Sequence, residues 1–366
     1  MFSLKRLTGL LLIAIIVITV APQGRQVNAQ DDGVLPTSFK LDITRLRHEY
    51  QGWNNCGPTT LTMGLTYFGY TDNQLPAAHF LKPNGEDKNV NPWEMVDYVN
   101  NVASLMTNVR ALYRPGGDFE LIKRLLVADF PVIIEKGFDV EDLDWMGHYL
   151  LLIGYDDNES VFYTYDSYLG HGNFQGLKEP YATVESYWWN FSNTFIVLYA
   201  PEREAEVLQI LGERADLNQA YQLMSQTAQT SAAANGQDAW AWFNIGDALT
   251  HLGYYAEATG FFRVAFDLGL PWRALWYRHT PLEAFYRTGE FNTVLELVQQ
   301  AKLTTPYVEE WDYYHGLVFA SQGRTADAKA QLNEALQYNS NFQAAKDVIA
   351  QLDAGTFVAV AQTDVQ

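Results

Sequence analysis

The stretch "YQGWNNCGPTTLTMGLTYFGY" (residues 50–70) contains the only cysteine of the 366-residue chain, Cys56. Pro58 suits the first turn of a helix, where its missing N–H would have no partner in any case. Apolar side chains then recur with helical spacing up to Phe68, so the sequence predicts a helix over about 58–68. Cys56 would lie at the N-terminus of this helix, where free N–H groups and the helix dipole stabilise a thiolate.

A lone cysteine has two interpretations. In an oxidising compartment cysteines usually pair, and an odd one suggests a reactive thiol or an intermolecular disulfide. The alternative is a buried thiol that packs as a small apolar side chain. The cysteine count does not separate the two, whereas the expected position of Cys56 at a helix start favours a nucleophile.

Residues 1–29 have the three-part pattern of a secretory signal peptide. Two basic residues, Lys5 and Arg6, precede an apolar run that ends at Ala21, and small residues stand at Val27 and Ala29. The run is short for a membrane span, and an uncleaved membrane anchor is the alternative. We expect a secreted or extracytoplasmic protein, in solution or attached to the cell surface, with no membrane span after cleavage.

The charge and the histidines argue against several kinds of partner. Removal of residues 1–29 takes away three basic residues and no acidic ones, which changes the formal charge from −19 to −22. Such an acidic chain repels phosphate backbones, so we expect no nucleic-acid partner. We also expect neither a metal nor a cofactor, because five histidines lack the spacing of metal ligands; they are His79, His171, His251, His279 and His315.

Residues 36–200 predict an α+β domain, in which helices come first and most strands later. Short runs of β-branched and aromatic residues between turn formers indicate strands; they are "FPVIIEKG" (130–137), "HYLLLIGY" (148–155), "VFYTYD" (161–166) and "TFIVLYA" (194–200). Two segments with helical spacing indicate helices; they are "NPWEMVDYVNNVASLM" (91–106) and "DFELIKRLLVADF" (118–130), the second with Asp118 as its N-cap.

Residues 202–354 are helical in pattern and repeat themselves. Gly246 and Gly253 stand 70 residues before Gly316 and Gly323, and Gly289 follows Gly253 by 36 residues. Repeats of roughly 35 residues fit this spacing, which is that of helix-pair repeat proteins.

The repeats resemble the tetratricopeptide repeat. Its W-x2-L-G-x2-Y-like signature is matched by Trp242, Ile245, Gly246 and, further on, Gly253 and Tyr254. The second copy is degenerate, with Leu282 in place of the first glycine, and residues 202–232 would be a leading helical segment. Three such units stack into a solenoid that offers a concave surface to a protein partner or serves as a structural buttress. Residues 355–366 would be a flexible tail.

A candidate base and its orienting group come from a predicted hairpin. The segments "GHYLLLIGY" and "SVFYTYD" flank a polar turn, and a turn centred near Asp157 places His148 opposite Asp166 or within one residue of it. Directly opposed residues share a face, with Cβ atoms roughly 5 Å apart. The imidazole and the carboxylate would then lie side by side, as a catalytic base requires. A one-residue slip in register would separate them.

Gln51 lies five residues before Cys56. Taken alone, a glutamine there is an ordinary surface residue. Beside a nucleophilic cysteine, its amide is placed to donate to a developing oxyanion together with the N–H of Cys56.

These segments together resemble the bacteriocin-leader, or double-glycine, cysteine peptidases and their exported relatives, which have a papain-like fold. The family pattern is a Gln, then Cys-Gly-Pro, and later a Gly-His before an apolar strand and an Asp that opens a turn. Gln51, Cys56, His148 and Asp166 match this order, and the resemblance covers about residues 36–200. It implies a Cys-His-Asp triad with Gln51 as the oxyanion donor, although Ser167 stands where the family often has proline.

The sequence thus predicts an α+β papain-like peptidase domain (36–200) followed by an all-α tetratricopeptide-like helical solenoid (202–354). The expected function is that of a secreted cysteine peptidase that hydrolyses a peptide or protein substrate. Two alternatives keep the same fold. One is a non-catalytic module that binds peptides or the cell wall, and the other is an acyltransferase or amidase that uses the same triad.

Overall fold

The computed structural model describes residues 34–87, 89–140 and 144–364. The expected signal peptide at 1–29 lies outside these residues, and the residues from Leu35 onward belong to one unit. This unit contains both strands and helices up to Tyr199, with α1–α3 (residues 56–101) before most of the strands, and helices alone follow from there. This order confirms the predicted fold class, an α+β region followed by an all-α region.

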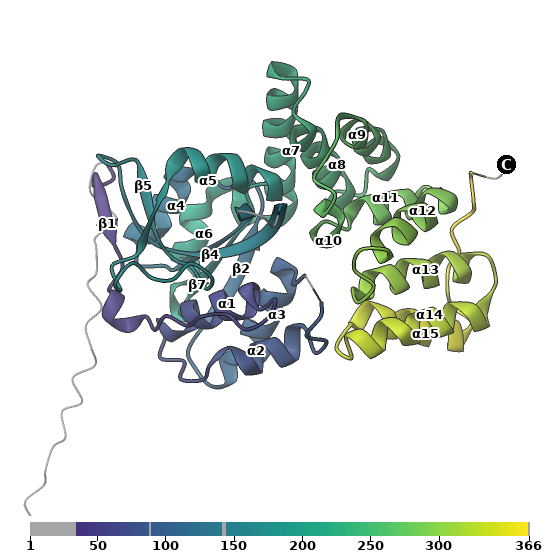
Figure 1. Cartoon of the computed structure of the whole chain (residues 1–366), viewed down its shortest axis with the longest axis horizontal. Coiled ribbons are helices and arrows are strands. Elements are labelled where there is room, and N and C mark those ends of the chain that lie inside the picture. Colours follow the sequence, from purple (N-terminus) through teal and green to yellow (C-terminus); the bar gives the residue numbers. More distant parts are fainter. Residues whose placement is uncertain (1–33, 88, 141–143, 365–366) are drawn as a thin grey trace, which may run out of the picture. The chain divides into compact units, whose positions relative to one another are not determined.

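In the part of the chain that the structure describes, seven strands form one antiparallel sheet (Figure 1). The strand order is β2-β7-β3-β4-β5-β6, and β1 pairs with β4. The strands are β1 (Ser38–Lys40), β2 (Arg110–Arg114), β3 (Val132–Val140), β4 (Asp144–Asp156), β5 (Val161–Tyr165), β6 (Leu177–Pro180) and β7 (Phe195–Tyr199). Each of the four strand segments expected from the sequence lies in one of them.

Helices cover both faces of this sheet, with α1, α2 and α3 on one face and α4 and α5 on the other (Figure 1). The helices are α1 (Cys56–Thr66), α2 (Gln74–Leu81), α3 (Pro92–Asn101), α4 (Phe119–Val127), α5 (Tyr181–Trp188) and α6 (Glu204–Leu211). Asp118 is the N-cap of α4, as expected, and its side chain accepts a hydrogen bond from the N–H of Leu121. A capped start fixes where the helix begins and therefore how it meets the sheet.

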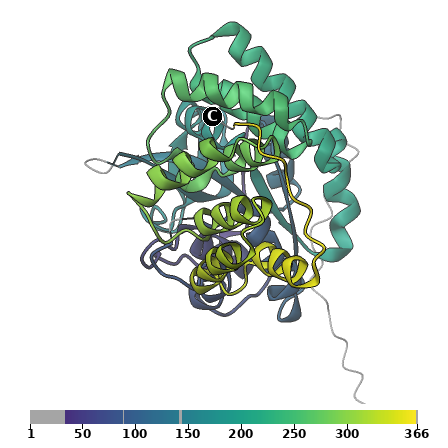
Figure 2. The same ribbon diagram turned by 90° about the vertical axis from the view of Figure 1, so that its right-hand side faces the viewer.

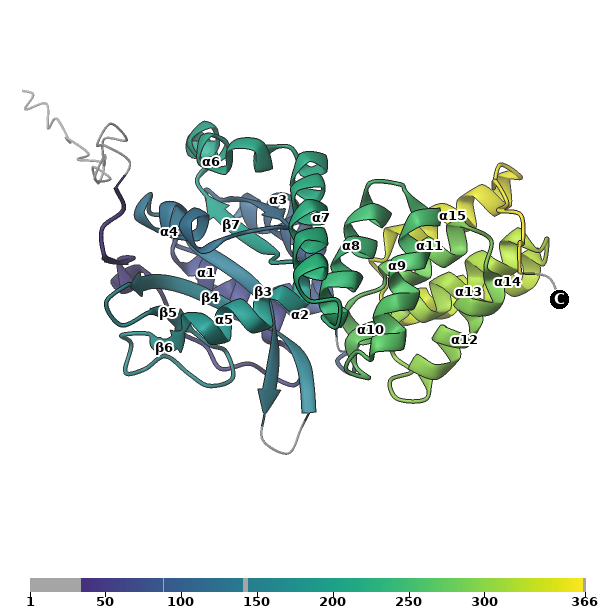
Figure 3. The same ribbon diagram turned by 90° about the horizontal axis from the view of Figure 1, so that it is seen from above.

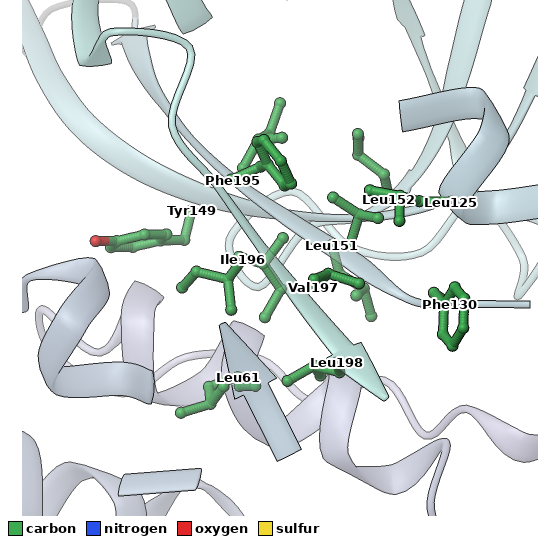
Figure 4. Close-up of a cluster of buried hydrophobic side chains, with 14 of the residues drawn as sticks. Leu61, Leu125, Phe130, Tyr149, Leu151, Leu152, Phe195, Ile196, Val197 and Leu198 are labelled. Atoms are coloured by element: carbon green, nitrogen blue, oxygen red, sulfur yellow. The ribbon is translucent and has the colours of Figure 1, made fainter. Parts of the chain in front are cut away.

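Helix α1 is the best-buried helix of the α+β region, since all of its residues after Cys56 are buried. It approaches the sheet closely at Gly64, where an added Cβ would lie 2.6 Å from a methyl group of Leu198. Figure 4 shows Leu61 of this helix below Ile196 and beside Leu198 of β7. Close packing of this kind resists displacement of the helix, so α1 presents its N-terminal residue, Cys56, from a rigid support.

The all-α region consists of helix pairs that stack side by side (Figures 2 and 3). Its helices are α7 (Leu217–Ala234), α8 (Ala239–His251), α9 (Tyr255–Leu268), α10 (Ala274–Tyr277), α11 (Thr280–Arg287), α12 (Phe291–Lys302), α13 (Glu309–Ser321), α14 (Thr325–Tyr338) and α15 (Gln343–Ala354). Gly253, Gly289 and Gly323 make the turns inside the pairs α8–α9, α11–α12 and α13–α14, with φ values of 83°, 80° and 75°. Only glycine adopts this backbone conformation readily, which explains the spacing in the sequence.

The short helix α10 lies between two helix pairs and connects the repeats with the sheet. Its last residue, Tyr277, packs on Gly147 of β4, where an added Cβ would come within 2.9 Å of both Tyr277 and Phe191. The next residue, Arg278, is buried and donates hydrogen bonds to the carbonyl of Asn190 (2.5 Å) and to Ser192 Oγ (2.9 Å). The repeats therefore contact the strand that carries His148.

The segment after α15, expected to be a flexible tail, lies along the repeat helices instead. Its backbone N–H groups at Val360 and Thr363 donate to Ser321 Oγ (3.2 Å) and to the carbonyl of Gly289 (2.8 Å). The sequence predicted a segment whose backbone groups bond to water, whereas these two N–H groups have partners in the repeat helices.

Three buried carboxyl groups and a half-buried one, Glu94, lie close together where the start of α3 meets the start of α13. Asp87 and Glu94 come from the α+β region, and Glu309 and Glu310 begin α13. Asn91 Nδ2 donates to Glu94 Oε2 and to Glu310 Oε1, each at 3.1 Å. Burial, and then the charge of Glu310, raises the pKa of Asp87 to about 7 and that of Glu94 to about 8.

These raised pKa values predict a stability that falls with rising pH. In the folded protein these carboxyl groups stay protonated up to about neutral pH. In the unfolded chain the same groups have ordinary pKa values of about 4 and are already ionised. The free energy of unfolding should therefore fall from pH 5 to pH 8. Glu94→Gln, which cannot ionise, should flatten this dependence, as measured by denaturant unfolding at both values. The exposed Glu296→Gln is the matched control, and an unchanged slope in Glu94→Gln would contradict the assignment.

Candidate active site

Cys56 is the first residue of α1 and is half-buried. Its thiol is hydrogen-bonded to the imidazole of His148. Burial raises the pKa of a thiol, but here the hydrogen bond and charge of His148, with a smaller effect of Lys82, outweigh burial. The pKa of Cys56 lies below its ordinary value, so the sulfur carries thiolate character at a helix N-terminus.

Sequence reasoning missed Lys82, a buried cation near the thiol of Cys56. Its side chain is 3% exposed, and Nζ donates to the carbonyls of Asn54 (3.0 Å) and Asp87 (3.1 Å). These bonds hold the loop that leads into α1 and keep a positive charge near Cys56. No local pattern marks Lys82, because its partners are backbone carbonyls 28 and 5 residues away.

The hairpin that carries the imidazole and the carboxylate has a different register from the one expected. Strand β4 runs to Asp156 and β5 begins at Val161, so the turn is centred later than Asp157. The pairing joins Leu151 to Tyr165, the last residue of β5. Asp166 is therefore level with position 150, not with position 148, and the expected direct opposition is wrong by two residues.

His148 and Asp166 nevertheless meet, because residues two apart on a strand share a face. The His148 Nε2 atom lies 3.0 Å from Asp166 Oδ1. The same oxygen accepts the backbone N–H groups of Tyr168 (2.7 Å) and Leu169 (2.9 Å), and His48 Nε2 donates to the Asp166 carbonyl at 2.8 Å. The carboxylate is thus held from several sides, and the Nδ1 atom of His148 is left for the thiol.

The imidazole of His148 and the carboxylate of Asp166 each stabilise the charged form of the other. Burial disfavours the imidazolium, but the charge of Asp166 and its hydrogen bond outweigh burial and raise the pKa of His148 to about 9. Burial likewise raises the pKa of a carboxyl, and His148 reverses the effect, so the pKa of Asp166 lies below its ordinary value. Around neutral pH the imidazolium and the carboxylate are therefore the favoured forms, and the imidazolium in turn stabilises the thiolate of Cys56.

The structure brings Gln51 to the same place through Ser167. The Gln51 N–H donates to the Ser167 carbonyl at 2.8 Å, and Ser167 Oγ donates to Gln51 Oε1 at 2.8 Å. With Oε1 engaged, the amide Nε2 keeps its two N–H groups for another acceptor. The serine in the position of the family's proline thus orients the glutamine amide, a role that the sequence did not suggest.

A small cavity of about 10 Å³ adjoins Cys56, enough room for about one water molecule. Its wall includes Glu135 from β3, Tyr149 from β4 and Tyr277 from α10. None of these three stood out in the sequence, because they meet only through the strand pairing and the packing of α10.

Two further findings concern the described ranges 34–87, 89–140 and 144–364. They contain no group of three or more His, Cys, Asp or Glu side chains that is arranged to hold a metal ion. None of their helices is both long enough and apolar enough to cross a membrane.

An antiparallel α+β domain that presents a cysteine at the start of a buried helix beside a strand histidine defines the papain-like class of folds. Comparison with known proteins agrees with this class. Residues 40–196 match the model of the Peptidase_C39 like family. The match covers the α+β region and leaves the helical repeats outside.

Similar solved structures are distant. A protein described as a C39-like peptidase from Bacillus anthracis is 18% identical and covers 44% of this chain and 98% of its own, with a TM-score of 0.35. The structure of MamA is 15% identical and covers 38% of this chain and 84% of its own, with a TM-score of 0.32. None of the curated proteins matches the chain.

Proposed function

We propose that the chain is a cysteine peptidase in which Cys56 attacks a peptide carbonyl. The observation that carries the proposal is the hydrogen-bonded series of thiol, imidazole and carboxylate at the start of α1. A nucleophile beside a base that a third group orients is the general requirement for covalent acyl transfer.

The steps follow from the positions of the side chains. The Cys56 thiolate forms a bond to the carbonyl carbon, and the oxyanion is stabilised by the Cys56 N–H and the Gln51 amide. His148 then gives its proton to the leaving amine as the C–N bond breaks, which leaves an acyl-enzyme. His148 then deprotonates a water molecule, which attacks the acyl carbon; the C–S bond breaks, the acid product leaves, and the Cys56 thiolate is restored beside the imidazolium.

Turnover of a peptide library tests the proposal. The purified chain should cleave a subset of peptides, and Cys56→Ala should cleave none while it keeps the same thermal unfolding curve. A chain that binds peptides and cleaves none would support the non-catalytic alternative, and incorporation of an added amine would indicate acyl transfer.

Loss of the Gln51 amide should act on the chemical step. We expect Gln51→Ala to lower kcat by about 10²–10³-fold with little change in KM, because an oxyanion donor works mainly in the transition state. Ser167→Ala should lower kcat by a smaller factor, since it frees the amide without removing it. Steady-state kinetics check both, and a rise in KM without a fall in kcat would contradict the assignment.

A further inference from the structure

The cavity beside Cys56 lies on a defined side of the thiol. In the proposed reaction His148 protonates the leaving amine, so the amine side of the substrate must face His148 and the acyl side must lie away from it. The described residues that line the small cavity include Cys56, Glu135, Gly147, Tyr149 and Tyr277, but not His148. The cavity is therefore placed to receive the acyl side of the substrate.

Glu135 is the carboxyl group of this cavity, and its burial favours the protonated form. It pairs across the sheet with Tyr149 and is 5% exposed. The Tyr149 hydroxyl donates its one hydrogen to the Val90 carbonyl at 2.7 Å. That hydrogen is then not available to a Glu135 carboxylate. Burial raises the pKa of Glu135 to about 8.

Arg278 is the basic side chain whose charge acts most on Glu135, but no ion pair joins the two among the described residues. Arg278 lies 2.7 Å from Asp247, also bonds Asn190 and Ser192, and only partly offsets the burial of Glu135. Among the ion pairs of the described residues, none includes Glu135. The carboxyl group is thus buried next to the nucleophile without a counter-ion of its own, an arrangement that costs stability.

A larger cavity of about 420 Å³ adjoins the small one, and Glu135 and Tyr277 line both. Carboxyl groups outnumber bases in its wall: Glu94, Asp247, Glu283 and Glu310 join Glu135, against Arg278 and two histidines. Of the histidines, His251 has a lowered pKa because it is buried, and His279 lies 3.2 Å from Glu310. Aromatic rings such as Tyr277 and Tyr313 complete the wall. Asp247, Glu283 and Glu310 already have partners in Arg278, Arg287 and His279. Glu94 and Glu135 remain for a ligand, and aromatic rings beside them also favour a cation.

We propose that Glu135 is a specificity determinant that recognises a positively charged group on the acyl side of the scissile bond. The group is a lysine or arginine side chain, or the α-ammonium of a peptide that begins there. When the cation enters, Glu135 gives its proton to solvent and forms an ion pair with the ligand. The assignment of the acyl side rests on the proposed function, whereas the cavity and its unpaired carboxyl group do not.

Binding to a Cys56→Ser variant of the full chain tests the proposal without turnover. The probes are peptides that the wild type cleaves and their partners in which lysine is replaced by norleucine. Each peptide is made with a free and with an acetylated N-terminus. This comparison distinguishes recognition of the lysine side chain from recognition of the α-ammonium group. Calorimetry at pH 6.5 in two buffers of different ionisation enthalpy gives affinity and proton release together.

We expect the cationic peptide to bind at least tenfold more tightly than its neutral partner and to release up to one proton. Glu135→Gln, which keeps the size of the side chain but cannot ionise, should lose both effects, and the exposed Glu296→Gln should keep both. Equal affinity for cationic and neutral peptides, or a preference that survives in Glu135→Gln, would overturn the proposal.

The rate at which iodoacetamide alkylates Cys56 separates this proposal from the proposed function. One outcome refutes only the role of Glu135. In that case Cys56 of Glu135→Gln is alkylated fast at pH 6, but no variant binds cationic peptides more tightly than neutral ones. Slow alkylation in the wild type, with no peptide cleaved, refutes the peptidase itself and the inference with it.

Discussion

At pH 6, iodoacetamide should alkylate Cys56 of the wild-type protein roughly ten- to a hundredfold faster than Cys56 of His148→Ala. An ordinary thiol with a pKa near 8.5 is only ~0.3% ionised at that pH. The imidazolium of His148 keeps the pKa of Cys56 below its ordinary value, so a far larger fraction is thiolate. The lower intrinsic nucleophilicity of a low-pKa thiolate offsets part of the gain.

The same experiment has a pH signature. The advantage of the wild type should shrink as the pH rises toward 9, because the unassisted thiol of the variant then ionises as well. Mass spectrometry follows the reaction without ambiguity, since Cys56 is the only cysteine of the sequence. The exposed His79→Ala is the control and should react like the wild type. Equal rates for wild type and His148→Ala at pH 6 would refute the thiolate assignment.

Removal of the Asp166 side chain should lower kcat/KM by about 10²–10³-fold. Asp166 holds Nε2 of His148 at 3.0 Å and raises the pKa of the imidazole. Asp166→Ala loses both effects and also leaves the N–H groups of Tyr168 and Leu169 without their acceptor. The loss should therefore include some stability, typically about 1–3 kcal/mol for an unsatisfied buried group.

Asp166→Asn separates the two effects. Its carbonyl oxygen can keep all three hydrogen bonds, so the fold should remain as stable as the wild type while the charge is lost. Activity should then lie between those of wild type and Asp166→Ala, and the exposed Asp72→Ala should behave as wild type. Steady-state kinetics and thermal unfolding check the series. An Asp166→Ala variant as active as the wild type would exclude the carboxylate from the mechanism.

Much of the fold could be predicted because its signals are local. Pro58 and the apolar spacing after it indicate α1, and Asp118 indicates the start of α4. The glycines of the repeats are readable because each turn needs a positive φ. The start of α1 at Cys56, two residues before Pro58, is within the usual uncertainty of helix ends.

The less predictable parts depend on tertiary contacts. The hairpin brings His148 to Asp166 although the predicted register was wrong, since a shift of two residues keeps both on one face. Glu135 and Tyr277 are 142 residues apart in the sequence and meet only through the packing of α10 on β4. The hydrophobic periodicity of the two segments does not predict that contact.

The contact of Tyr277 with Gly147 has a consequence for the cavity beside Cys56. The region that matches the family model supplies Cys56, but part of the cavity wall comes from a helix beyond residue 196. A change in the repeats would alter the shape of this cavity while Cys56, His148 and Asp166 stayed unchanged. In the proposed peptidase, selectivity would thus depend partly on helices outside the α+β region and could change separately from the chemistry.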